Sequence, residues 1–154
     1  MHTRPVRLPA LLLLFVAMTF ARPVLAEEVT VMTYNVENMF DVFDDPYTED
    51  EGTDIKRRDE VVAIAASIEH SDADIVVFQE LENEYMLEGM VGTFLSGKGY
   101  DYVAVQRTNS GRGINLGVIS RYPIKRIASY RFLDLTHPDA SGRTWRFAWD
   151  AMHI

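Results

Sequence analysis

A short apolar run that ends in carboxylates, Asp74-Ile-Val-Val-Phe-Gln-Glu-Leu-Glu-Asn83, is the feature that most constrains how this chain folds. Residues 75–78 are all apolar, which predicts a buried strand. Glu80 follows that strand, so we expect its carboxylate at the strand's carboxyl end, where α/β proteins commonly bind ligands. Glu80 is therefore the first candidate for chemistry. The alternative is that Glu80 and Glu82 belong to a solvated turn that leads into a helix.

A second strand-like run, residues 30–35, also ends in a polar side chain and continues to Asp41. Together, the segments TYNVENMFD and DIVVFQELEN resemble the opening motifs of the endonuclease/exonuclease/phosphatase superfamily. Residues 112–124, RGINLGVISRYPI, resemble the superfamily's third segment, which is a strand followed by a turn that contains Pro and Ile. Three motifs in the right order form a specific resemblance to these metal-dependent enzymes. The superfamily includes pancreatic deoxyribonuclease, abasic-site endonucleases, sphingomyelinases and inositol phosphatases.

The resemblance implies both a fold and a reaction. The fold is α/β (α+β), a four-layer sandwich of two packed β-sheets flanked by helices. The reaction is hydrolysis of phosphate esters with Mg²⁺ or Mn²⁺ as the cofactor. Glu80 matches the superfamily's metal-binding glutamate, and Asn35 matches the asparagine that assists the metal or the phosphate. A neutral amide suits that position because it donates a hydrogen bond to a phosphate oxygen without charge repulsion.

Arg112 is a candidate for substrate binding. It lies between two glycines in a turn, and its guanidinium can hold phosphate with two parallel hydrogen bonds. A solvated turn arginine is the alternative. The substrate class stays open among nucleic acid, phospholipid head groups and sugar phosphates, because fold analogy does not choose among them.

The superfamily's later motifs have no counterpart between residues 27 and 154. These motifs are a histidine that closes a strand, an Asp-x-Asn pair and a final Asp-His pair. His137 and His153 do not match them. We therefore expect the chain to supply about the first half of such a domain and to be inactive by itself. The alternative is a non-catalytic binding or structural module that keeps the front half of the fold.

Residues 1–26 have the pattern of a secretory signal peptide. A basic start with Arg4 and Arg7 precedes 14 uncharged residues, and small or compact residues lead up to Ala26. This run is shorter than the roughly 20 residues that cross a bilayer. We expect cleavage after Ala26, a secreted or periplasmic domain over residues 27–154, and no stable membrane insertion. The chain has no cysteine, so that domain is held together by burial rather than by disulfides.

The charge of the domain is uneven. Residues 27–88 carry 19 acidic and 3 basic side chains, a net charge of −16, whereas residues 89–154 carry 4 and 9, a net charge of +5. An acidic surface argues against non-specific coating of nucleic acid. It remains compatible with a phosphate held by a metal ion and a few arginines.

Periodicity predicts the elements. Helices are expected over residues 55–71 and 83–96, and strands over 29–34, 75–78, 100–106, 114–120, 127–135 and 144–151. Turn-rich connections fall at 108–113 and 136–142. The acidic segment 41–54 has no apolar period and lacks the pattern of a calcium loop, which favours a flexible, solvated loop. The order of elements predicts helices that cover a mixed or antiparallel sheet.

Overall fold

The computed structural model describes residues 28–50, 52–136 and 143–154. The expected signal peptide lies outside these residues, and so does the 136–142 turn beyond Thr136, including His137. None of the helices within the described ranges is long and apolar enough to cross a membrane.

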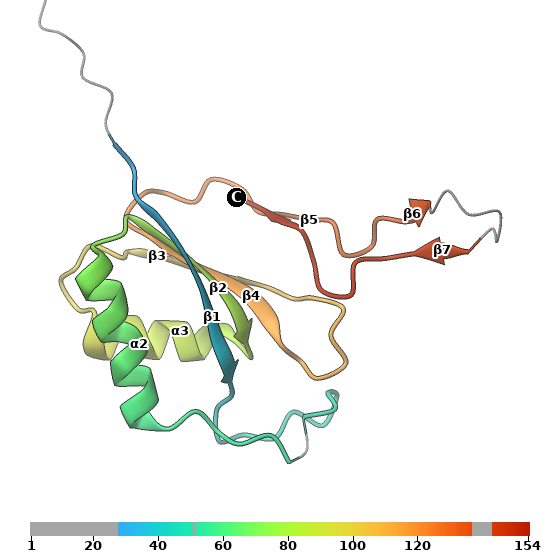
Figure 1. Ribbon diagram of the computed structural model, residues 1–154, viewed down its shortest axis with the longest axis horizontal. Coiled ribbons are helices and arrows are strands. Elements are labelled where there is room, and N and C mark those ends of the chain that lie inside the picture. Colours follow the sequence, from blue (N-terminus) through green and yellow to red (C-terminus); the bar gives the residue numbers. More distant parts are fainter. Residues whose placement is uncertain (1–27, 51, 137–142) are drawn as a thin grey trace, which may run out of the picture.

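A four-stranded mixed sheet forms the centre of the fold (Figure 1). Its strands are β1 (Val31–Met39), β2 (Ile75–Leu81), β3 (Tyr102–Gln106) and β4 (Asn115–Ser120), in the spatial order β1-β2-β4-β3. Strands β1 and β2 run parallel, whereas β4 pairs antiparallel with both β2 and β3. The carboxyl ends of β1 and β2 therefore meet at one edge of the sheet. The mixed sheet confirms the sequence-based prediction.

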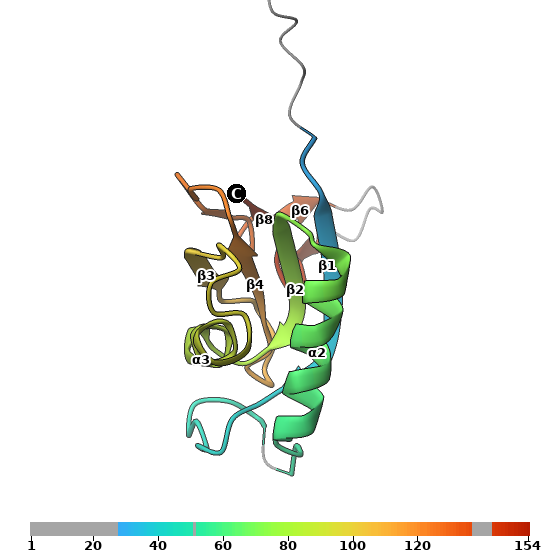
Figure 2. The ribbon, with the colours of Figure 1, turned by 90° about the vertical axis from the view of Figure 1, so that its left-hand side faces the viewer.

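Two helices, α2 (Arg58–Ser71) and α3 (Glu84–Phe94), cover one face of this sheet (Figure 2). Their buried side chains are largely those that the 3.6-residue period selects: Ile64, Ala65 and Ile68 from α2, Leu87 and Met90 from α3, and Leu95 just after α3. These side chains share one core with residues of β2 such as Val76, Phe78 and Leu81. The predicted apolar stripes are confirmed.

The predicted start of the first helix at Ile55 is wrong by three residues. Helix α2 begins at Arg58, because the N–H of Lys56 donates to the carbonyl of Phe40 at 2.9 Å and keeps that stretch outside the helix. The carboxylate of Glu60 then accepts a hydrogen bond from the N–H of Arg57 at 3.0 Å. This side-chain acceptor satisfies a backbone donor at the helix terminus.

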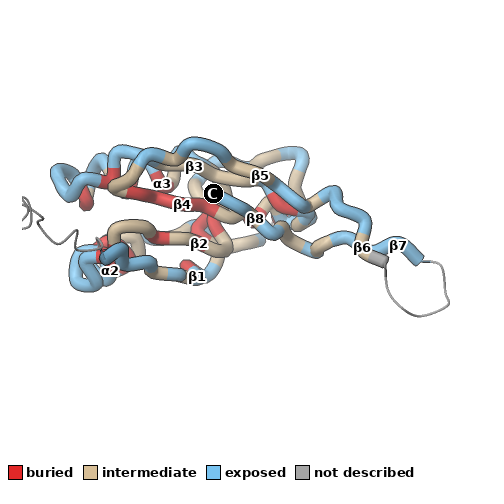
Figure 3. Tube along the Cα trace, turned by 90° about the horizontal axis from the view of Figure 1, so that it is seen from above, coloured by how far each residue is buried: buried red, intermediate tan, exposed pale blue. Residues whose placement is uncertain are grey.

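The last part of the chain lies on the side of the sheet away from the helices (Figures 1 and 3). It forms two short antiparallel ladders. In one, β5 (Ala128–Ser129) pairs with β8 (Met152–His153); in the other, β6 (Leu135–Thr136) pairs with β7 (Thr144–Trp145). Helices, central sheet and ladders are thus arranged in layers, which confirms the α/β (α+β) sandwich as the fold class.

The two long strands predicted at 127–135 and 144–151 are wrong. Each predicted strand is reduced to two-residue pieces near its ends, because polar bonds bend the chain between them. The carboxylate of Asp150 accepts the N–H of Tyr130 at 2.8 Å and the hydroxyl of Ser129 at 2.6 Å. The N–H of Leu133 then donates to the carbonyl of Tyr130 at 2.9 Å, which closes a turn.

Candidate active site

The structure brings two of the predicted site residues into direct contact. Asn35 lies on β1 and Glu80 on β2, and the Nδ2 of Asn35 donates to Oε1 of Glu80 at 3.0 Å. The Oδ1 of Asn35 accepts the backbone N–H of Glu37 at 2.9 Å, so both ends of the amide are engaged. Asn35 is exposed and Glu80 is half-buried. The pair therefore forms an open polar site at the carboxyl end of the parallel strands.

The sequence predicted that Glu80 follows the strand. In the structure it lies inside β2, at a bulge. Gln79 and Leu81 pair with consecutive residues of β4, Leu116 and Asn115, so Glu80 has no partner in that strand. Its φ is +65°, in the left-handed region. A bulge sets a residue apart from the ladder and re-aims its side chain. Here it gives Glu80 a direction that regular strand geometry would not.

The facing strand carries a larger bulge at the same place. Asn35 pairs with Gln79 and Met39 pairs with Leu81, so three residues of β1 face the single bulged residue of β2. Two of the three, Glu37 and Asn38, have φ of 52° and 58°. A non-glycine residue with positive φ costs on the order of 1–3 kcal/mol. Strain of this kind, concentrated around one carboxylate, is typical of functional sites.

Arg112, the predicted phosphate-binding residue, lies beside this bulge. Its Nη2 donates to Oδ1 of Asn38 at 3.0 Å and to Oγ1 of Thr53 at 3.5 Å. Arg112, Asn38 and Thr53 all line a polar cavity of about 420 Å³. The guanidinium is exposed and stands next to the Asn35–Glu80 pair rather than in contact with it. Its role in substrate binding stays a prediction.

The acidic segment 41–54 is irregular, as predicted, but it is docked rather than freely solvated. The N–H of Glu49 donates to the carbonyl of Gly111 at 2.7 Å, and Asp50 is buried and accepts the hydroxyl of Thr48 at 2.9 Å. Gly113 has a φ of +75°, and a Cβ there would meet the side chain of Thr48 at 2.8 Å. Glycine at this position therefore lets the two loops pack together beside the site.

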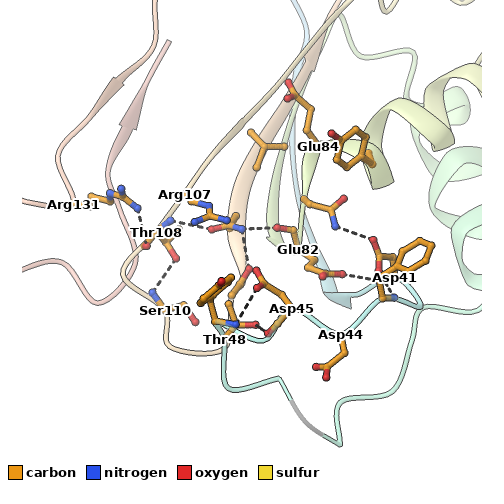
Figure 4. Close-up of a pocket in the computed structure, with 17 residues that line it drawn as sticks. Asp41, Asp44, Asp45, Thr48, Glu82, Glu84, Arg107, Thr108, Ser110 and Arg131 are labelled. Atoms are coloured by element: carbon orange, nitrogen blue, oxygen red, sulfur yellow. Dashed lines mark hydrogen bonds between the residues drawn. The ribbon is translucent and has the colours of Figure 1, made fainter.

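A second, larger cavity of about 680 Å³ opens between this loop and the ends of β2 and β3 (Figure 4). Its lining includes Glu82 but not Glu80. The carboxylate of Glu82 accepts the N–H of Asp41 at 2.7 Å, and Asp41 accepts Nδ2 of Asn83 at 2.9 Å. Sequence reasoning missed this network. The pattern Glu-x-Glu-Asn after the strand, together with the Asp that ends the first motif, is the signal that points to it.

The two glutamates have different neighbours. Burial raises the pKa of Glu82, and the carboxylates of Asp41, Asp50 and Asp45 raise it further, against the opposing hydrogen bond from Asp41. Glu80 instead accepts an amide N–H and remains partly open to solvent. Both carboxylates are half-buried and each accepts a hydrogen bond, so Glu80 is distinguished by its bulged backbone and its contact with Asn35 rather than by exposure.

The carboxylate oxygens of Glu80 are ligands of the kind that a hard divalent cation prefers. Mg²⁺ binds through oxygen, uses one or two carboxylates and retains several waters. Glu80 offers one such carboxylate, held in place by Asn35. Within the described ranges no group of three or more His, Asp or Glu side chains converges on a common point. Among the described residues, Glu80 is thus the one carboxylate that we assign to this site.

One comparison with known proteins adds to this geometry. The sequence profile described as the Endonuclease/Exonuclease/phosphatase family matches residues 32–152, which include Asn35, Glu80 and Arg112. Neither the curated proteins nor the solved structures gave a match to the chain. The family match spans most of the sequence and both bulged strands. The chain belongs to the endonuclease/exonuclease/phosphatase family.

Proposed function

We propose that this chain carries the metal-binding edge of a divalent-metal-dependent hydrolase of phosphate esters. The family contains hydrolases of the phosphodiesterase, nuclease and phosphatase type. The observation that carries the proposal is the contact between Asn35 and Glu80 at two facing bulges. Strained backbone around an oriented, accessible carboxylate has no benefit for stability, and it suits a ligand site.

Each residue has a distinct task in this proposal. Glu80 holds the ion, Mg²⁺ or Mn²⁺, which supplies Lewis-acid polarisation of a phosphate oxygen. Asn35 fixes the rotamer of Glu80 through its Nδ2, while its own orientation is set by the N–H of Glu37. Arg112 turns from Asn38 towards a non-bridging phosphate oxygen when substrate binds, because its exposed guanidinium has donors beyond those that it uses here.

The decisive experiment replaces Glu80 with glutamine. The Glu80→Gln variant keeps the size of the side chain and removes the charge, so we expect loss of Mg²⁺ affinity and of turnover. Lost Lewis-acid stabilisation corresponds to several kcal/mol of barrier. Activity of protein expressed from its full open reading frame is measured against a phosphodiester and a phosphomonoester, with Mg²⁺ titrated in each case.

Glu88→Gln is the matched control. Glu88 is exposed on α3 and belongs to neither cavity, so its replacement should leave activity and Mg²⁺ dependence unchanged. Unchanged Mg²⁺ dependence in Glu80→Gln would place the metal on a different carboxylate. Metal binding without turnover on any phosphate ester would favour the non-catalytic module.

We also propose that the domain is exported, as either a secreted or a periplasmic protein. The support is the basic start, the 14 uncharged residues and the cleavage pattern that ends at Ala26. N-terminal sequencing of protein recovered from the expressing cells tests this. We expect the mature chain to begin at Glu27, and a retained Met1 would contradict export by cleavage.

A further inference from the structure

The left-handed pair Glu37–Asn38 needs support from outside β1. Both residues are non-glycine with positive φ, a conformation that persists only where the surrounding structure holds it. The pair lies between Asn35, whose amide orients Glu80, and Met39, which is fully buried. Any relaxation of the pair therefore shifts the backbone that carries Asn35.

Lys56 holds this pair from the opposite loop. Its Nζ donates to the carbonyl oxygen of Glu37 at 2.6 Å, and its backbone N–H donates to the carbonyl of Phe40 at 2.9 Å. One bond therefore holds the carbonyl inside the left-handed pair, and the other holds the chain two residues after it. A hydrogen bond from a charged ammonium is roughly twice as strong as a neutral one. The bond lies at an exposed position, although the Lys56 side chain as a whole is half-buried.

A continuous chain of hydrogen bonds leads from Lys56 to the metal-binding carboxylate. Nζ of Lys56 donates to the carbonyl of Glu37, and the N–H of Glu37 donates to Oδ1 of Asn35 at 2.9 Å. Nδ2 of Asn35 then donates to Oε1 of Glu80 at 3.0 Å. Arg112 contacts the same pair through Oδ1 of Asn38, and it lines the same cavity as Lys56. Two cations from separate loops thus converge on one strained turn.

We propose that Lys56 is a positioning residue of the site: by holding the carbonyl of Glu37 it fixes the amide of Asn35 and, through it, the direction of Glu80. This inference rests on the proposed function for its catalytic consequence. The geometric part, that Lys56 stabilises the Glu37–Asn38 turn, stands on the contacts alone. Lys56 touches neither the reacting atoms nor Glu80.

The test compares Lys56→Met with Lys56→Arg. Methionine keeps the apolar stem and removes the donors, whereas arginine restores a cationic donor. In Lys56→Met we expect Mg²⁺ affinity or turnover to fall by up to about tenfold, no more than the loss from removing Asn35, because Lys56 acts on Glu80 only through that outer partner. We also expect faster hydrogen exchange at the Glu37 amide in metal-free protein. Lys56→Arg should recover most of both properties.

Lys98→Met is the matched control, because Lys98 pairs with Glu69 on the surface and makes no contact with the bulge. It should leave Mg²⁺ affinity and Glu37 exchange unchanged. If Lys56→Met unfolds, Lys56→Leu replaces it, since leucine also keeps an apolar stem and has no donor. Wild-type Mg²⁺ affinity together with wild-type Glu37 protection in the folded variant would overturn the proposal.

The two proposals fail in distinguishable ways. If Glu80→Gln leaves the Mg²⁺ dependence unchanged, the proposed metal site is wrong. The exchange rate of the Glu37 amide in the metal-free Lys56 variants still reports on the turn itself. Slow exchange at Glu37 in Lys56→Met would reject the positioning role even where Glu80 proves to bind the metal.

Discussion

At the scale of single residues, Asn35 and Glu80 divide one task between a neutral and a charged group. Glu80 supplies the anionic oxygen, and Asn35 supplies the hydrogen bond that directs it. Because the Oδ1 of Asn35 already accepts the N–H of Glu37, its amide acts here mainly through orientation. Loss of the orienting group should therefore cost less than loss of the charge.

The first prediction compares Asn35→Ala with Glu80→Gln. A hydrogen bond to a charged group contributes about 1.5 kcal/mol at the low end, so we expect Asn35→Ala to lower turnover roughly tenfold. Glu80→Gln should cost several kcal/mol more in barrier. Turnover and Mg²⁺ titrations on both variants check this order. Equal losses would mean that Asn35 itself contacts the metal or the phosphate.

The sequence predicted these two residues but not how the backbone presents them. The resemblance to the superfamily's motifs assigned both residues to one site, and the parallel pairing of β1 and β2 brings them together. Nothing in Gln79-Glu80-Leu81 signals a left-handed φ at Glu80, because positive φ at a non-glycine residue is imposed by the register of both neighbouring strands. Lys56 was missed for the same reason: its contact with Glu37 joins residues that only the folded loop brings together.

At the scale of elements, a glycine in β4 sets how closely β2 and α3 approach. Gly117 is buried opposite Phe78, and a Cβ there would lie 2.4 Å from Cδ2 of Leu81 and 2.7 Å from Cδ1 of Leu87. Both leucines are fully buried. Any side chain at this position must therefore displace the two leucine side chains or push α3 or the end of β2 outwards. The end of β2 carries Glu80, so the packing of the core and the site are connected.

The second prediction contrasts Gly117→Ala with Gly92→Ala. Overpacking at Gly117 should destabilise the fold by about 1–3 kcal/mol. Gly92 lies inside α3, and a Cβ there meets nothing within 4 Å. Alanine at Gly92 should stabilise the helix by about 0.5–1 kcal/mol. Urea unfolding of both variants measures the free energies. Stabilisation by Gly117→Ala would show that the two leucines repack freely.

Elements were predictable where local pattern decides them and not where distant partners do. The helical stripes around Ile64 and Met90 follow from period alone, and both were confirmed. The strand expected at 127–135 has a suitable local composition, but its backbone finds partners for only two residues near each end. Asp150, far along the chain, diverts the intervening stretch into a turn.

At the scale of the whole molecule, the two edges of the sheet treat their charged side chains differently. The edge with Glu80 contains three of the four described non-glycine residues with positive φ, the fourth being Asp72 at the other edge, and cavities lie at both edges. At the other edge, Arg121 donates to Asp72 at 2.6 Å and to Asp74 at 3.2 Å, and its guanidinium lies 5.0 Å from the ring centre of Tyr100. The edge with Glu80 thus presents open polar groups. At the other edge the charges pair with one another, and Arg121 connects three turns.

The third prediction concerns how the stability contributed by Asp74, at the edge with Arg121, depends on pH. The N–H of Thr30, at 2.8 Å, lowers the pKa of Asp74, and the guanidinium of Arg121 lowers it further. A carboxyl whose folded pKa is below its unfolded value of about 3.9 stabilises the fold above that value. The contribution is lost as pH falls through the folded pKa. Asp74→Asn should therefore lower the melting temperature at pH 7, and the difference should shrink below about pH 4. Thermal melts from pH 7 down to pH 3 measure it.

Asp101→Asn is the control, because Asp101 is exposed and its side chain makes no hydrogen bond among the described residues. A deficit in Asp74→Asn that stays constant down to pH 3 would show that the loss comes from packing rather than from the charge of Asp74.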